Sequence, residues 1–145
     1  MEAFAYARAR LSAPELQRFV RIETLPQWCA GIAEVLEHSG ERGEISCLWG
    51  RFRVHREVIR DGIRFSLPGC PNALQWTLTV ENAGSEGRIT VHCSINRAEP
   101  DPDFAESIEE FVRDWRQGLE QGWESARQRA SRLPAAEAEC MPWYG

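Results

Sequence analysis

The sequence predicts a single α+β domain in which a long C-terminal helix packs on the apolar face of an antiparallel sheet. Apolar residues recur with helical spacing between residues 13 and 38, alternate as in a strand between 44 and 96, and return to helical spacing after 102. The chain has 145 residues, of which 43% are hydrophobic and 27% charged, as in one globular domain. We therefore expect residues 1–133 to form the domain and residues 134–145 to form a flexible tail.

Two helices are expected before the sheet. Ser12 and Glu15 form a capping box, in which each side chain hydrogen-bonds the backbone of the other, and predict a helix over residues 13–22. Thr24 opens a second such pattern and predicts a helix over residues 25–38. The apolar side of this second helix would hold Trp28, Ile32, Val35 and Leu36. Residues before Ser12 alternate alanine with larger side chains, which allows a strand, although alanine favours a helix.

Four strands are expected in the middle of the chain, arranged as a meander with one apolar and one polar face. The alternating segments lie at residues 48–58, 63–67, 74–80 and 89–95. Asp61-Gly62 is a favoured pair for a two-residue hairpin turn, which would place Arg60 opposite Ile63. A fifth strand follows if the N-terminal residues are extended.

The last helix is expected to begin at Pro102, with Asp101 as its cap, and to run to about residue 132. Its apolar stripe comprises Phe104, Ile108, Phe111, Val112, Trp115, Leu119 and Trp123. Gly118 and Gly122 interrupt the helix, and close backbone packing is one explanation for them. The order of elements resembles the helix-grip arrangement, in which a curved sheet wraps a long C-terminal helix around a cavity. With four or five strands, the chain would form a reduced version of it.

Composition excludes several function classes. All 17 basic residues are arginine, which excludes catalysis through a lysine Schiff base or a phosphate-loop lysine and is typical of a GC-rich bacterial genome. A net charge of −5 and a pI near 5.3 argue against nucleic-acid binding. The sequence contains no apolar run long enough for a membrane span and no apolar core of a signal peptide near its start. We therefore expect a soluble, cytoplasmic protein.

The five cysteines indicate reduced thiols. Their number is odd, and no Cys-x-x-Cys spacing occurs, so neither a disulfide framework nor a zinc ribbon is expected. Cys70 lies in a tight loop between Pro68 and Asn72 and is a candidate reactive thiol. The alternative is that the turn at this position accommodates a small residue.

The most distinctive candidate site is a row of basic residues on the predicted first hairpin. Arg51, Arg53 and His55 share its polar face by alternation, and Arg64 faces the same way on the next strand. Such a row suits an anionic ligand or an acidic protein segment. The alternative is a solvated face on which the arginines pair with Glu57 or with the acidic last helix. Arg56 and Arg60 fall on the apolar face by strict alternation, where a bulge or a sheet edge would accommodate them.

Two histidines project from the same polar face and suggest a second interpretation. His55 and His92, together with Arg53 and Arg64, would form the site of a small enzyme. A third ligand at matching spacing is missing, so no metal is expected. A sheet face open to water is a poor place for electrostatic catalysis, which works best where water is excluded.

The sequence therefore favours a non-catalytic binding or accessory module over an enzyme. It would recognise an apolar ligand between sheet and helix, or an anionic or protein partner through the arginine-rich hairpin. No cofactor and no catalytic residue is assigned, and the chain is expected to be a monomer or a homodimer.

Overall fold

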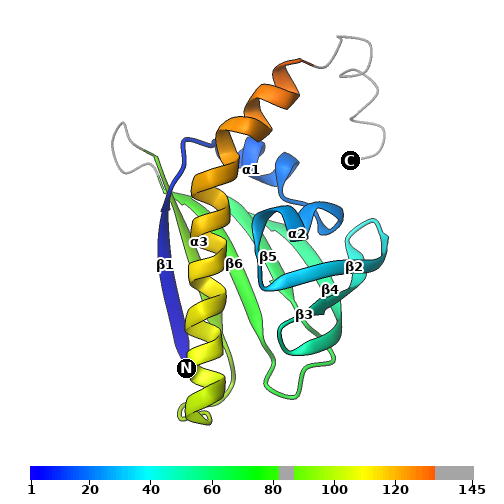
Figure 1. Ribbon diagram of the computed structural model, residues 1–145, viewed down its shortest axis with the longest axis vertical. Helices are drawn as coiled ribbons and strands as arrows, with labels where there is room; N and C mark the ends of the chain where they lie inside the picture. Colours follow the sequence, from blue (N-terminus) through cyan, green and yellow to red (C-terminus); the bar gives the residue numbers. More distant parts are fainter. Residues whose placement is uncertain (82–86, 133–145) are drawn as a thin grey trace.

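The computed structural model describes residues 1–81 and 87–132, and it shows an antiparallel sheet wrapped around one long helix (Figure 1). The sheet has seven strands in the order β1-β7-β6-β5-β4-β3-β2. The strands are β1 Glu2–Arg8, β2 Ile32–Ser39, β3 Arg42–Cys47, β4 Gly50–Ile59, β5 Gly62–Ser66, β6 Gln75–Glu81 and β7 Arg88–Ser94. The helices are α1 Ala13–Phe19, the 3-10 turn η1 Ile22–Thr24, α2 Leu25–Trp28 and α3 Pro102–Ser131.

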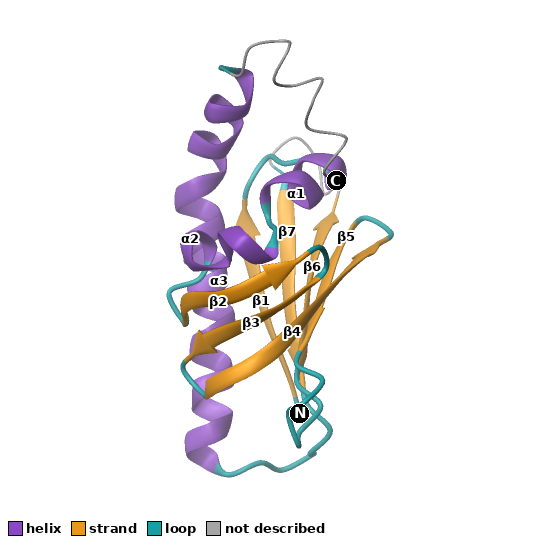
Figure 2. Ribbon diagram, turned by 90° about the vertical axis from the view of Figure 1, so that its right-hand side faces the viewer, coloured by secondary structure: helices purple, strands orange, loops and turns teal. Residues whose placement is uncertain are grey.

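The predicted fold class is confirmed, while the predicted number of strands is too low. The sheet is antiparallel and α3 packs on its concave face (Figure 2). The capping box that begins α1 is present, because the Glu15 amide donates to Ser12 Oγ at 3.2 Å and the Ser12 amide donates to Glu15 Oε1 at 3.0 Å. The predicted tail lies outside the described residues. No helix of the described ranges combines the length and the apolar character needed to cross a membrane.

The helix predicted over residues 25–38 is wrong. Its first turn is α2, which ends at Trp28, and Ile32–Ser39 form strand β2. The pairing of β2 with β3 shifts register twice along β2, and each shift breaks the alternation expected of a strand. Apolar residues on a bulged strand therefore imitate helical spacing. Thr24 does not cap α2, because its hydroxyl donates to the carbonyl of Phe19 at 2.9 Å.

The ambiguous N-terminal residues form an edge strand. Ala3, Ala5 and Ala7 point to the concave face and are buried, while the residues between them point outward. β1 pairs with β7 over its whole length and lies against α3. Burial of small side chains under the helix therefore overrides the helical preference of alanine.

The hairpin between β4 and β5 turns one residue earlier than predicted. Ile59 pairs with Gly62 and Arg56 with Phe65, so the turn residues are Arg60 and Asp61. Gly62 is the first residue of β5, and a Cβ there would lie 1.9 Å from the carbonyl oxygen of Leu78 on β6. The close approach of β6 thus requires glycine inside the strand rather than in the turn.

Helix α3 begins where the sequence predicts, with Asp101 accepting from the Asp103 amide at 3.1 Å. Gly118 lies where α3 crosses α2, and a Cβ there would stand 1.7 Å from the carbonyl oxygen of Trp28. At Gly122 the neighbour is the Trp28 ring, at 3.1 Å. The close packing offered as an explanation of these glycines is therefore what the structure shows.

We predict that Gly118→Ala destabilises the fold by about 1–3 kcal/mol, because the added methyl group overlaps a backbone oxygen that cannot rotate away. At an unobstructed helical position the same change gains about 0.5–1 kcal/mol. Urea unfolding measures the change in the free energy of unfolding for Gly118→Ala and for Gly122→Ala. Equal destabilisation by the two changes, or stabilisation by both, would contradict the close approach of α3 to the Trp28 carbonyl.

Candidate functional site

The predicted basic row lies on the convex face of the sheet. Glu57 pairs with Arg64 and His55 with Ser66 across β4 and β5, so Arg51, Arg53, His55 and Arg64 do share a face. Two of the three guanidiniums are neutralised, since Arg51 lies 3.4 Å from Glu44 and Arg64 lies 2.9 Å from Glu57. Arg53 is exposed and has no ion-pair partner within the described ranges. The row therefore carries little uncompensated charge, and recognition of an anionic partner there stays a prediction.

The two histidines of the enzyme interpretation lie apart. His55 is on β4 and His92 on β7, three strand intervals or about 14 Å away. His92 stacks on Phe4 with ring centroids 4.5 Å apart, and its Nε2 lies 2.8 Å from Glu2 Oε1. The structure does not bring the two imidazoles together, so this grouping supplies no shared acid–base site. Within the described residues, no three His, Cys, Asp or Glu gather in a way that would hold a metal ion.

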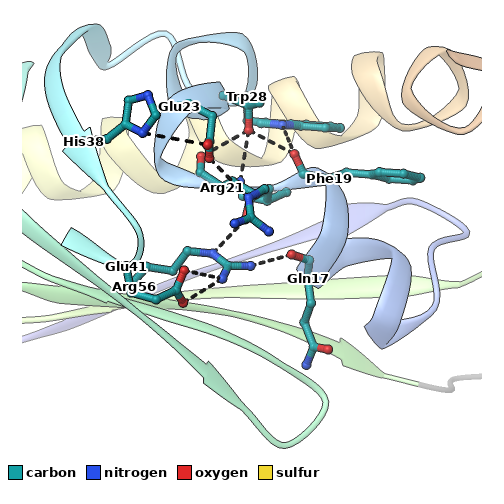
Figure 3. A network of polar contacts seen from close by, with 10 residues as sticks. Gln17, Phe19, Arg21, Glu23, Trp28, His38, Glu41 and Arg56 are labelled. Carbon is teal, nitrogen blue, oxygen red and sulfur yellow. Dashed lines mark hydrogen bonds and ion pairs between the residues drawn. The ribbon is translucent and has the colours of Figure 1, made fainter. Parts of the chain in front are cut away.

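Arg56, which strict alternation placed on the apolar face, is indeed buried there and has structural partners (Figure 3). Its Nη1 donates to both carboxylate oxygens of Glu41, at 2.8 and 3.1 Å. Its Nε donates to the Val20 carbonyl at 3.1 Å, and its Nη2 donates to the Gln17 carbonyl. These bonds join β4 to α1 and to the β2–β3 turn. Because its donors are engaged in this way, Arg56 fixes the helical segment to the sheet and is poorly placed to bind a ligand.

The space between α3 and the middle strands is filled by a continuous chain of aromatic rings. It starts at half-buried Phe104 and Trp49, whose centroids are 6.1 Å apart, and passes from Trp49 to Phe111 at 4.8 Å. It continues from Phe111 to Trp76 at 5.0 Å and from Trp76 to Trp115 at 6.3 Å. Phe65 stacks against both Trp76 and Trp115. The chain therefore leads from the surface to the centre of the domain.

Two polar atoms at the inner end of this chain lack partners. Nε1 of Trp76 and Nε1 of Trp115 are buried and make no hydrogen bond. Two other indoles have acceptors, since Trp49 donates to Ser107 Oγ at 2.8 Å and Trp28 to the Phe19 carbonyl at 3.3 Å. A buried donor without an acceptor costs about 1–3 kcal/mol. The interior thus presents two unsatisfied donors in otherwise apolar surroundings.

Strand pairing is incomplete at one end of the sheet. Strand β4 pairs with β5 only from His55 onward, so its first half has no paired strand on that side. The β3–β4 turn, the β5–β6 loop and the connection to α3 all lie at this end (Figure 2). Half-buried apolar side chains gather on these segments and on the N-terminus: Met1, Cys47, Trp49, Phe52, Cys70 and Phe104. These half-buried side chains pack against the buried core and cover the outer end of the aromatic chain.

Comparisons with known proteins identify the fold. No protein-family model matches the chain, and no curated protein matches its sequence. A START superfamily protein from Mycobacterium smegmatis superposes with a TM-score of 0.62 at 15% identity, over 86% of this chain and 97% of that one. The major latex-like protein 151 of Panax ginseng gives 0.57 at 12% identity, over 85% and 97%. The di-domain ARO/CYC BexL from the BE-7585A biosynthetic pathway gives 0.59 at 17% identity, over 86% of this chain and 46% of that one.

These identities show the fold alone, which is the helix-grip arrangement of START proteins. The resemblance expected from the order of elements is confirmed, and the sheet is not the reduced form expected. Trp76, Phe111 and Trp115 lie at apolar positions of the predicted strand and helix, but such a pattern does not tell whether an indole N–H has an acceptor. Trp49 falls inside the strand predicted over residues 48–58, whereas it lies in the turn between β3 and β4.

We predict that iodoacetamide at pH 8 labels Cys70 well before Cys29 and Cys93. Burial raises the pKa of Cys93 to about 12 and also raises the pKa of Cys29, so both thiols stay protonated and unreactive at pH 8. Cys70 is only half-buried and is the candidate thiol, whereas burial raises the pKa of Cys47, the other half-buried thiol, which donates to the Gly50 carbonyl at 3.3 Å. Peptide mass spectrometry of the labelled native protein measures the order. Labelling of Cys93 at the rate of Cys70 would show that the interior opens freely.

Proposed function

We propose that the chain is a small binding module whose ligand lies between α3 and the sheet, among Phe65, Trp76, Phe111 and Trp115. The observation that carries this proposal is the pair of buried indole N–H groups without acceptors. Buried tryptophans usually donate to a partner. Two unsatisfied donors at the centre of one aromatic cluster are best explained by an acceptor that a ligand brings.

The chemistry of the interior defines the ligand class. The rings offer apolar faces for stacking, and their two N–H groups can only donate. Among the described residues Arg56 is the one charged side chain that is buried, and its guanidinium is engaged by Glu41 and backbone carbonyls. A planar, mostly apolar, uncharged molecule with a carbonyl or hydroxyl oxygen fits these requirements.

The ligand is expected to enter at the end of the sheet where β4 is not paired with β5. Trp49 is half-buried there and held by one side-chain hydrogen bond, to Ser107. Because the aromatic rings already contact one another, the ligand must separate them. Trp49 is the ring expected to move, because it is half-buried and makes one side-chain hydrogen bond. The packed interior is thus the unliganded state, and binding exchanges ring–ring contacts for ring–ligand contacts.

Binding is proposed rather than catalysis because no carboxylate or imidazole is buried among the described residues. The buried nucleophiles among them are the thiols of Cys29 and Cys93, which burial keeps protonated by raising their pKa. The label ARO/CYC belongs to BexL and rests here on fold likeness alone.

We predict that fluorenone binds this protein at least about fivefold more tightly than fluorene, its counterpart without the carbonyl oxygen. One new hydrogen bond to a previously unsatisfied donor is worth about 1–3 kcal/mol, and 1.4 kcal/mol corresponds to tenfold in affinity. Indole NMR signals provide the readout, and those of Trp76 and Trp115 should shift with fluorenone. The Trp28 indole, which already has an acceptor, is the internal control.

Equal affinity for the two compounds, with no movement of the Trp76 and Trp115 signals, would contradict the proposal. Binding accompanied by shifts on outward-facing residues alone would place the ligand elsewhere.

We also predict that replacing Trp76 by its benzothiophene isostere leaves the unliganded protein at least as stable as the parent and weakens fluorenone binding. The isostere keeps the shape of the ring and removes the donor, so the cost of burying an unsatisfied N–H disappears. Thermal unfolding and the fluorenone titration measure the two effects. The same replacement at Trp28 is the matched control and should destabilise, because it removes a bond to the Phe19 carbonyl. Loss of stability at Trp76 equal to that at Trp28 would show that the Trp76 N–H has a partner after all.

A further inference from the structure

A cavity lies at the C-terminal end of β1, where this strand meets α3. It has a volume of about 840 Å³ and is lined by Tyr6, Ala7, Arg8, Gly87, Arg88, Arg116 and Glu120. This volume is within the range of about 300–1,000 Å³ that small-molecule sites occupy. None of these residues belongs to the aromatic interior, so the cavity is independent of the proposed function.

Positive charge is concentrated at this cavity by the strand register. Arg8 and Arg88 occupy directly opposite positions of β1 and β7 and lie on the same, convex face. Cβ atoms of such a pair are about 4.5–5.5 Å apart, and like charges there destabilise the sheet. Arg116 adds a third guanidinium from α3.

The carboxylates nearby neutralise these charges incompletely. Glu81 accepts from Arg88 Nε at 3.1 Å, and hydrogen bonds from Thr90 and Arg88 lower the pKa of Glu81, so it is ionised at neutral pH. Glu120 lies 3.5 Å from Arg116 Nε and also accepts from the backbone amide of Arg8 at 2.9 Å. Within the described residues, the Arg8 guanidinium has no carboxylate partner. Three guanidiniums thus share two carboxylates.

We propose that this cavity binds the phosphate group of a small phosphorylated molecule, held by Arg8, Arg88 and Arg116. A multiply charged oxyanion relieves the repulsion between Arg8 and Arg88, and arginine donates in the planar fork that suits phosphate oxygens. Phosphate is favoured over a single carboxylate because its tetrahedral oxygens can accept from guanidiniums on three different elements. Arg88 also lies over the Tyr6 ring, 4.9 Å from its centroid, which holds the guanidinium at the cavity.

The experiment is a titration of the full chain with inorganic pyrophosphate, followed by amide NMR and by the thermal midpoint. Signals of Tyr6, Arg8, Gly87 and Arg88 should shift, the midpoint should rise, and sodium chloride should weaken the binding. Arg8→Gln should weaken binding by about tenfold. The same variant should raise the thermal midpoint in phosphate-free buffer, because it removes a like-charge pair. Arg53→Gln, which removes an unpaired arginine from the same sheet face outside the cavity, should leave the affinity for pyrophosphate unchanged.

Three results would overturn the proposal. The first is the absence of any shift at the cavity. The second is an equal loss of affinity in Arg8→Gln and Arg53→Gln, which would show diffuse attraction to a charged surface. The third is tighter binding of citrate than of pyrophosphate, which would assign the cavity to carboxylates. None of these outcomes bears on the aromatic interior, so the two proposals can fail separately.

Discussion

The close approach of α3 to the concave sheet is the constraint on which the rest of the structure depends. At Gly118 the helix meets the Trp28 carbonyl with no side chain between them, and along β1 it lies on alanines. Small residues at these contacts bring the helix close to one edge of the sheet and to α2. The middle strands β5 and β6 instead present Phe65 and Trp76, which fill the space that sheet curvature leaves under the helix. The helix therefore lies close to its neighbours where the facing residues are small and farther from the sheet where they are aromatic.

The distribution of charge follows from the same arrangement. Concave positions are apolar, with the exception of Arg56, whose bonds to Glu41 and to two backbone carbonyls anchor the helical segment that closes the grip. Convex positions carry the other arginines of the described strands, and most ion pairs there are exposed and contribute little to stability. The described interior is therefore suited to an uncharged ligand, whereas the unburied arginines lie outside it. Where register opposes Arg8 to Arg88, the convex face gathers more positive than negative charge around a cavity.

Sequence reasoning predicted the elements whose signal is local. The cap at Asp101, the capping box at Ser12 and the alternation in β5, β6 and β7 all depend on neighbouring residues, and they were predicted correctly. Elements that depend on distant partners were missed or left open. β2 is a bulged strand whose spacing imitates a helix, and the alanine-rich segment that could be strand or helix is fixed as β1 by its pairing with β7 and its packing under α3. The candidate sites divide in the same way: the convex arginine row follows from alternation, whereas the unsatisfied indoles and the Arg8–Arg88 pair arise from contacts between distant segments.

We propose that the aromatic interior is a ligand site kept closed by its own rings. A crystal structure of the protein with fluorenone is the decisive measurement, because it locates the carbonyl oxygen of the ligand. We expect electron density for a planar molecule among Phe65, Trp76, Phe111 and Trp115. Its carbonyl oxygen should lie within hydrogen-bonding distance, about 2.7–3.2 Å, of Nε1 of Trp76 or Trp115. An interior with both indole nitrogens bonded to ordered water and no ligand density would contradict this proposal.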